Sequence, residues 1–263
     1  MTTSEPTIRQ NRHELRNRYV FRGQIAMQTA LHIGGGKVTL SSSDSPVVLT
    51  PDEKPFIPGS SFKGALRSSI EKIVPSLPAA SSLLSCALIE RSDVAIETPP
   101  LEKNQPPPWP REVCPTVWYN GLTRLRREYP RWEKEITDAA FDNLCSTCRL
   151  FGSPLAAARL NVNDLYMPAE EWSGVIQIRD GVAIDRDSEK AKDRLKYDFE
   201  VVPASAVFNL EITLENATKQ DLQLLCIGLS EFVHGFGTLG GKRSRGLGVS
   251  RLEGLKVWEL ELE

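Results

Sequence analysis

The sequence predicts an α+β protein with a ferredoxin-like core, because the order strand, helix, strand occurs twice along the chain. Apolar residues alternate with polar ones in the predicted strands, and a 3.6-residue apolar stripe marks each of the two main helices. Forty per cent of the residues are hydrophobic and 25% are charged, as in an ordinary globular protein. We expect a single domain over residues 1–263, with the core in 18–74 and 160–260 and an insertion at 75–158.

The amino-acid composition limits the classes of function that this protein can have. No run approaches the roughly 18 apolar residues of a membrane span, and the N-terminal residues lack the apolar segment of a secretion signal, so we expect a cytoplasmic protein with no membrane partner. A net charge of −2 argues against nucleic-acid binding through overall charge. Basic residues nevertheless cluster at 63–67, 179–196 and 242–245, and local charge decides where an anion binds.

The first predicted strand begins near Phe21 and ends in the glycines 34–36, where the backbone can turn tightly. Its apolar residues occupy alternate positions and so share one face of the strand, which places His32 on the opposite, polar face. A structural histidine and a role in RNA contact or catalysis both remain open for it. A serine-rich run then leads to a lone acid, Asp44, which without further context is typical of a turn or a cap.

The first predicted helix opens at Pro58 and Gly59, and Ser60 or Ser61 is expected to cap it. A short hairpin over residues 47–57 precedes the helix, and prolines beyond residue 74 end it. Lys63 and Arg67 add positive charge four residues apart, near the positive end of the helix dipole. This helix start therefore suits an anion such as phosphate.

The insertion is rich in proline and contains a basic and aromatic segment, residues 118–132, which we expect to be partly helical. It could stack on RNA, form a solvated helix face or contact a subunit. Cys145 and Cys148 form a Cys-x-x-Cys pair, and Cys86 and Cys114 supply two more thiols in a region without histidine. The alternatives are one structural Zn²⁺ held by these four residues or four reduced cysteines. Cys226 is expected in the core of a later helix.

The segment 179–203 has two β-prone flanks around a highly charged centre, which predicts a protruding hairpin that carries Arg179 and Arg186. A solvated surface loop is the alternative. An alternating strand near residues 208–214, a helix over 219–233 and a last strand over 252–260 complete the core. Between the helix and the last strand lies a glycine-rich loop, residues 235–248, whose N–H groups and basic side chains favour a phosphate site over a plain β-turn.

Residues 57–67, IPGSSFKGALR, preceded by Leu31-His-Ile-Gly-Gly and Asp44-Ser-Pro, resemble the signature of the RAMP superfamily of CRISPR RNA-guided effector proteins. The closest resemblance is to the backbone subunits of type III effectors. It recurs at 178–208 and 235–248, so it covers most of the chain. The resemblance implies a core of the RNA-recognition type, a thumb hairpin that wedges between nucleotides at 179–203, and a zinc-stapled insertion.

The resemblance also implies a function: binding of CRISPR guide RNA and cleavage of complementary single-stranded target RNA, alongside other RAMP subunits of the effector. The residue that matches the family's cleaving aspartate is Asp44, which would act with Mg²⁺ or another divalent cation. The residues that we expect to contact RNA are Gly59, Ser60, Ser61, Lys63, Arg67, Arg179, Arg186, Gly240, Gly241, Lys242, Arg243 and Arg245.

Two other functions remain open. The chain could be a noncatalytic RNA-binding subunit, which the presence of Asp44 disfavours. It could instead be a stand-alone RAMP endonuclease that processes guide precursors. Such enzymes commonly use histidine-centred chemistry, and the thumb, the Cys-x-x-Cys pair and a total of three histidines disfavour this reading.

Overall fold

The computed structural model describes residues 14–35, 43–78, 81–89, 105–110, 113–168, 170–172, 174–184 and 191–262. Its centre is an antiparallel sheet with the strand order β3-β7-β1-β8. These strands are β1 (Asn17–Met27), β3 (Leu160–Val162), β7 (Val207–Glu215) and β8 (Ser250–Glu261). Taken along the chain, the second strand of the core pairs with the third, the third with the first, and the first with the fourth. This is the strand order of a ferredoxin-like core, as the sequence predicts.

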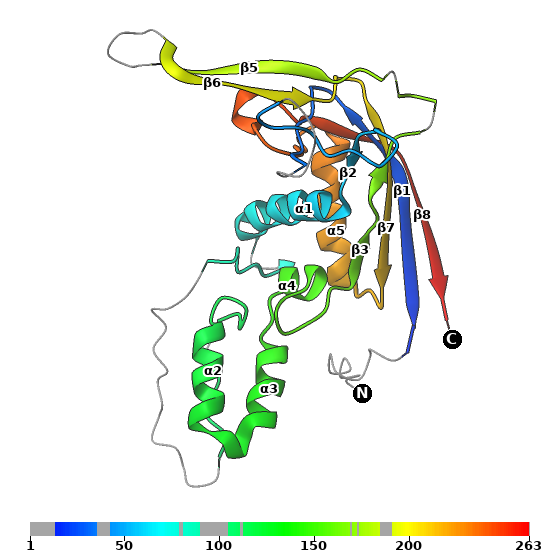
Figure 1. Cartoon of the computed structure of the whole chain (residues 1–263). Coiled ribbons are helices and arrows are strands. Elements are labelled where there is room, and N and C mark those ends of the chain that lie inside the picture. Colours follow the sequence, from blue (N-terminus) through cyan, green and yellow to red (C-terminus); the bar gives the residue numbers. More distant parts are fainter. Residues whose placement is uncertain are drawn as a thin grey trace.

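Helices α1 (Gly59–Ile73) and α5 (Lys219–Val233) pack side by side on one face of this sheet (Figure 1). The main hydrophobic core lies between the helices and the sheet. A Cβ atom at Gly228 would lie 2.7 Å from the Leu66 side chain and 2.8 Å from that of Ile70, so a glycine there allows the two helices to approach closely. Helix α5 begins with a capping box formed by Thr218 and Asp221.

Two expectations about these helices are wrong. The residue that caps α1 is Pro58, with no side-chain cap hydrogen bond, so neither Ser60 nor Ser61 caps the helix. Cys226 is exposed on α5 instead of lying in its core. Leu224 and Gly228 are buried instead, because the face toward α1 and the sheet is rotated from the one that the sequence pattern favours.

The insertion contains short helices, and it has hydrophobic clusters separate from the main core. The helices are η2 (Val74–Ser76), α2 (Tyr119–Glu128), η4 (Pro130–Trp132), α3 (Glu133–Asp142) and α4 (Ser146–Phe151). In one cluster Trp118, Leu122 and Leu125 pack against Ile136. The segment 118–132 therefore uses its apolar face to pair α2 with α3.

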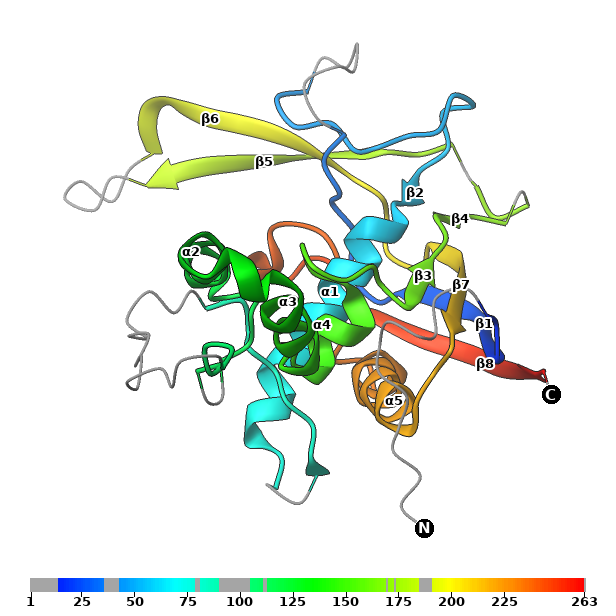
Figure 2. The same cartoon turned by 90° about the horizontal axis from the view of Figure 1, so that it is seen from below.

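The predicted hairpin consists of β5 (Gln177–Ile184) and β6 (Ala191–Val201), which pair in antiparallel register. It extends from one end of the core, whereas α2 and α3 lie toward the other (Figure 1). In the view from below, the hairpin lies along one edge of the molecule, on the side away from α5 (Figure 2). Two further strands, β2 (Phe56–Ile57) and β4 (Leu165–Tyr166), pair with each other. The expected hairpin over residues 47–57 is reduced to a bridge between Leu49 and Pro55. Among the described residues, no helix has both the length and the apolar character needed to cross a membrane.

Candidate functional site

The loop that carries Asp44 lies against the base of the β5–β6 hairpin. The Asp44 side chain is exposed, and its Oδ2 accepts a hydrogen bond from the Asp198 amide at 3.1 Å. In return, Asp198 Oδ1 accepts one from the Asp44 amide at 2.7 Å and one from the Ser43 hydroxyl at 2.9 Å. These reciprocal hydrogen bonds hold an exposed carboxylate at a defined place beside β6.

His32 connects this loop to the hairpin and to the glycine-rich loop. Its Nδ1 lies 2.7 Å from the Glu200 carbonyl oxygen, its Nε2 lies 3.3 Å from the Ser45 hydroxyl, and the edge of its ring packs on Phe199. The His32 carbonyl oxygen accepts a hydrogen bond from the Gly241 N–H at 2.8 Å. His32 is 6% exposed and has hydrogen-bond partners at both ring nitrogens, as a structural histidine would. The contacts with the loop and the hairpin bury it.

The glycine-rich loop packs its basic residues on aromatic side chains of β6. Lys242 Nζ lies 4.3 Å from the centre of the Phe199 ring and 5.1 Å from that of Tyr197, and Arg245 donates a hydrogen bond to the Tyr197 hydroxyl. Gly240 has a φ of +74°, and a Cβ there would lie 2.2 Å from the His32 carbonyl oxygen. A glycine is therefore required for the loop to reach His32.

Arg243 and Arg245 belong to the short helix η5 (Arg243–Arg245), and both are exposed. Arg179 is also exposed, on β5, and it pairs across the hairpin with Phe199. Arg186 lies outside the described residues. The structure thus brings Asp44, the hairpin base and the basic glycine-rich loop into one region, which we call the hairpin-base site: residues 43–47, 197–200 and 240–245, with His32 between them.

The start of α1 has a different environment from the one expected. Gly59 is buried, and its N–H donates to Asp164 Oδ1 at 2.7 Å. A carboxylate of the chain thus occupies the helix end where we expect a phosphate. Ser60 is exposed and Ser61 is half-buried. Lys63 Nζ donates to the Leu160 carbonyl oxygen at 2.9 Å, and burial, followed by the nearby charge of Arg67, lowers the pKa of this lysine.

Arg67 points toward the cysteines. Its guanidinium donates to Glu71 at 2.7 Å, to the Gly152 carbonyl oxygen at 3.2 Å and to the sulfur of Cys148 at 3.4 Å. The Arg67 and Glu71 side chains are only 16% and 13% exposed. Helix α1 is thereby tied to α4, the helix that begins with the Cys-x-x-Cys pair.

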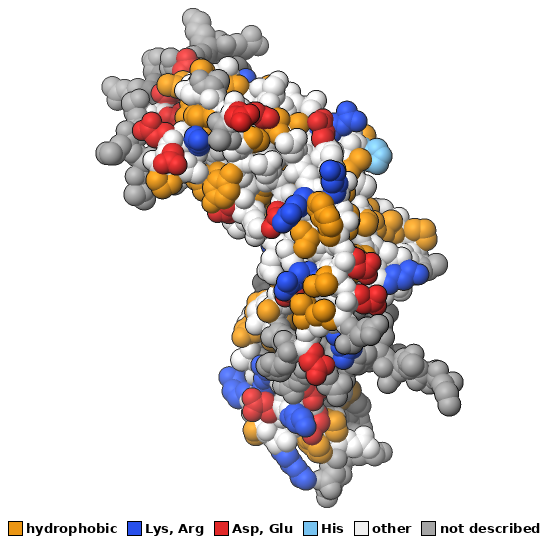
Figure 3. All heavy atoms as spheres, turned by 90° about the vertical axis from the view of Figure 1, so that its right-hand side faces the viewer, with side chains coloured by type: hydrophobic (Ala, Val, Ile, Leu, Met, Phe, Trp, Pro, Cys, Tyr) orange, Lys and Arg blue, Asp and Glu red, His pale blue; other side chains and the backbone are white. Residues whose placement is uncertain are grey.

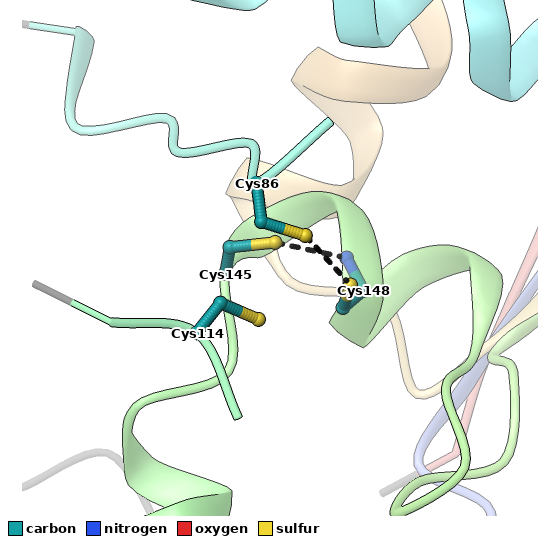
Figure 4. A group of neighbouring side chains, drawn as sticks. All are labelled: Cys86, Cys114, Cys145 and Cys148. Atoms are coloured by element: carbon teal, nitrogen blue, oxygen red, sulfur yellow. Dashed lines mark hydrogen bonds between the residues drawn. The ribbon is translucent and has the colours of Figure 1, made fainter. Parts of the chain in front are cut away.

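The cysteine cluster brings together all four predicted ligands, Cys86, Cys114, Cys145 and Cys148 (Figure 4). Their sulfur atoms lie within 4.8 Å of one another, and those of Cys86 and Cys148 are 3.6 Å apart. A tetrahedral Zn²⁺ with Zn–S bonds of about 2.3 Å separates its sulfurs by about 3.8 Å. The Cys145 sulfur also accepts the Cys148 N–H at 3.4 Å.

The four thiols are close enough to shift one another's pKa values. Hydrogen bonds from Cys145, Cys148 and Cys86 lower the pKa of Cys114, whereas the interaction with Cys114 raises that of Cys145. Sulfurs this close can share one negative charge, but further thiolates repel each other unless a cation lies between them. The cluster therefore fits a soft divalent metal such as Zn²⁺, which takes thiolate ligands.

Other parts of the surface carry mixed charge. On the face shown in Figure 3, Lys and Arg side chains are interspersed with Asp and Glu. This arrangement favours no extended anion site on that face.

Sequence reasoning missed Asp164, Asp198 and Glu200 as residues that organise the site. The only local signal is the alternation in Tyr197-Asp-Phe-Glu200, where two aromatic and two acidic residues occupy opposite faces of β6. That pattern does not identify which loop the acids bind.

Comparison with known proteins adds an independent finding. The chain matches the RAMP superfamily over residues 25–251. It is 48% identical over 59 residues to the CRISPR system Cms endoribonuclease Csm3 of Enterococcus italicus, covering 21% of this chain and 28% of that protein. For the protein of the same name from Methanothermobacter thermautotrophicus, identity is 43% over 56 residues, covering 20% and 23%.

The aligned segments thus span about a quarter of the length of these curated relatives. The family match, in contrast, extends over most of the chain and includes α1, β3, β7 and α5 of the core. On this match, the protein belongs to the RAMP superfamily.

Proposed function

We propose that this protein is a guide-RNA-binding backbone subunit of a type III CRISPR effector and that it cleaves complementary target RNA at Asp44. Its family and its similarity to proteins named CRISPR endoribonuclease support this function. The observation that carries the proposal is the hairpin-base site, in which an exposed carboxylate lies in the same region as a basic, glycine-rich loop.

Guide binding would rely on charge and backbone N–H groups. Arg243 and Arg245 are exposed, and Lys242 and Arg245 lie on aromatic rings of β6, which orient their long side chains. Phosphate contacts of this kind position RNA without reading its bases. The subunit would therefore accept any guide sequence, and base pairing between guide and target would supply specificity.

For cleavage, the Asp44 carboxylate would accept a hydrogen bond from a target ribose 2′-hydroxyl and orient it for in-line attack on the adjacent phosphorus. The 2′-hydroxyl gives up its proton to solvent as its oxygen forms a bond to phosphorus, the bond to the 5′-oxygen breaks, and that oxygen takes up a proton from solvent. The products are a 2′,3′-cyclic phosphate and a 5′-hydroxyl end. The hard carboxylate oxygens of exposed Asp44 fit Mg²⁺, which when bound would stabilise the developing charge.

The cysteine cluster would have a structural role. We infer that Cys86, Cys114, Cys145 and Cys148 hold one Zn²⁺, because their sulfur geometry suits four thiolate ligands and leaves no position for a reacting water. Such a site would fix residues 84–89 and 113–118 against α4, and the insertion would gain a staple that its small clusters need.

The test is target cleavage by the assembled effector with Asp44→Ala, with Mg²⁺ and with EDTA. Cleavage should fall by at least about 100-fold, while guide and target binding stay close to wild type. Asp52→Ala is the matched control, because Asp52 is an exposed acid on a neighbouring turn.

One observation favours a noncatalytic subunit: the Asp44 carboxylate already accepts a hydrogen bond from the Asp198 amide. A structural aspartate of this kind predicts that Asp44→Ala weakens the loop but leaves the cleavage rate unchanged. An unchanged rate in that variant would show that Asp44 is not the catalyst, and it would leave a noncatalytic RNA-binding subunit or cleavage by another residue.

A further inference from the structure

The hairpin base contacts the Asp44 loop through two consecutive same-face residues of β6, Asp198 and Glu200. The Asp198 carboxylate accepts hydrogen bonds from the Asp44 amide and the Ser43 hydroxyl. Glu200 continues the contact. Its amide donates a hydrogen bond to the Ser45 carbonyl oxygen at 3.0 Å, and its Oε2 accepts a hydrogen bond from the Val47 amide at 3.0 Å. The loop is thus bonded to one strand of the hairpin over most of its described length.

These contacts differ from ordinary loop packing in two respects. Asp198 exchanges hydrogen bonds with the residue proposed to orient the target ribose, and a carboxylate forms stronger hydrogen bonds to amides than a neutral acceptor does. In addition, β6 pairs with β5 in regular register from Val201 to Lys196, which joins this contact to the rest of the hairpin base, and the register shifts only beyond Val182, toward the tip. A displacement of the hairpin would therefore be transmitted directly to the loop.

We propose that Asp198 is a positioning residue that fixes the Asp44 loop to the hairpin, so that cleavage requires the hairpin to be docked on this loop. This inference rests on the proposed function of Asp44. Its physical basis is orientation: a carboxylate that must meet a 2′-hydroxyl at hydrogen-bond distance loses efficiency when its backbone is free to move. RNA binding through Arg243 and Arg245 does not depend on this contact.

Two substitutions separate hydrogen bonding from charge. Asp198→Ala removes the acceptor of the Asp44 amide, whereas Asp198→Asn keeps an acceptor oxygen and removes the charge. With the assembled effector and a saturating target, we expect Asp198→Ala to lower the cleavage rate about 10-fold or more with little change in target affinity. Asp198→Asn should keep most of the wild-type cleavage rate. Asp52→Ala, which alters an exposed turn, should match the wild type.

A second measurement does not depend on cleavage. Hydrogen exchange of the purified subunit, followed in peptides that cover residues 43–47, should be faster in Asp198→Ala than in Asp198→Asn or the wild type. If the alanine variant leaves either the exchange or the rate unchanged, the proposal is overturned. An asparagine variant as slow as the alanine variant would also overturn it, because the charge of Asp198 and not its hydrogen bond would then be required.

Comparing cleavage by Asp44→Ala with cleavage by Asp198→Ala distinguishes failure of the proposed function from failure of the positioning role. If Asp44→Ala cleaves at the wild-type rate, the proposed function fails, and with it the role of Asp198 in cleavage. If Asp44→Ala is inactive but Asp198→Ala cleaves normally, only the positioning role fails.

Discussion

Gly59 and Gly64 lie on the same helix, α1, but have different surroundings. A Cβ at Gly59 would lie 2.3 Å from the Val162 carbonyl oxygen, which is backbone and cannot easily move, whereas a Cβ at Gly64 would meet nothing within 4 Å. Gly59 is thus explained by close packing of α1 on β3, independently of any RNA contact.

We predict that Gly59→Ala lowers the free energy of unfolding by about 1–3 kcal/mol. Gly64→Ala, at an exposed helical position, should raise it by about 0.5–1 kcal/mol. Urea unfolding followed by circular dichroism measures both. Equal stability of the two variants would contradict the packing explanation.

The basic residues differ in how much of their charge is available to RNA. Arg243 is exposed, while Lys63 and Arg67 already donate to carbonyl oxygens of the chain and are partly buried. Removing an available charge should reduce the number of counterions released on binding RNA.

We predict that Arg243→Ala weakens binding of unrelated RNA sequences by the same factor. It should also reduce the slope of log K against log salt concentration by about 0.7. Lys63→Ala should change the slope less, since its ammonium group has a protein partner. Filter binding at several salt concentrations gives both slopes, with Lys256→Ala on β8 as a single-charge control. Losses that depend on RNA sequence would indicate base readout instead.

Residue-level predictions from the sequence succeed where the signal is local. Cys145 and Cys148 are three residues apart, at the N-cap and in the first turn of α4, so the pattern identifies this pair, whereas Cys86 and Cys114 are added as the remaining thiols of the insertion. The partner of Asp44 could not be predicted in this way, because Asp198 lies 154 residues further along the chain. No periodicity links two loops at that separation.

At the scale of elements, α4 is the junction between the insertion and the core. Arg67 on α1 donates to the Cys148 sulfur, and four thiolates around one Zn²⁺ would leave a net charge of about −2 that the partly buried guanidinium would offset. Hydrogen bonds to ligand atoms commonly affect metal affinity.

We predict that Arg67→Met lowers zinc affinity by about 10–100-fold, measured by competition with a chromogenic chelator. Arg124→Met, which removes an exposed ion pair on α2, is the matched control and should retain the wild-type affinity. Chelation of the wild type should loosen the insertion while the main core persists, because that core consists of residues on the sheet, α1 and α5. Folded protein that binds no zinc would exclude the metal site altogether.

The elements of the core follow closely from the sequence, and those of the insertion do not. Helix α5 has the predicted bounds, residues 219–233, because its apolar stripe and its capping box coincide. The insertion's own hydrophobic clusters were not expected, since proline and charge dominate its composition. Its core depends on a few large side chains, Trp118 and Trp132 among them, that come together only when α2 and α3 pair.

At the scale of the whole molecule, the hairpin and the insertion project from opposite ends of a compact core (Figure 1). A subunit of this shape can present its core to a guide RNA while each projection reaches beyond it. If identical subunits repeat along one guide, each places its Asp44 at the same position relative to its own hairpin, because the loop is bonded to β6.

We therefore predict that the assembled effector cuts a complementary target at evenly spaced positions, whatever the target sequence. The spacing should equal the length of guide that one subunit covers, because phosphate contacts carry no sequence information. Sequencing the ends of products from several unrelated targets measures it. Guides shortened by one such interval should lose one cut and keep the others, and effectors with Asp44→Ala should keep their guide but lose all of these cuts together. Products whose positions follow a preferred base instead of a fixed interval would contradict cleavage by repeated copies of this subunit.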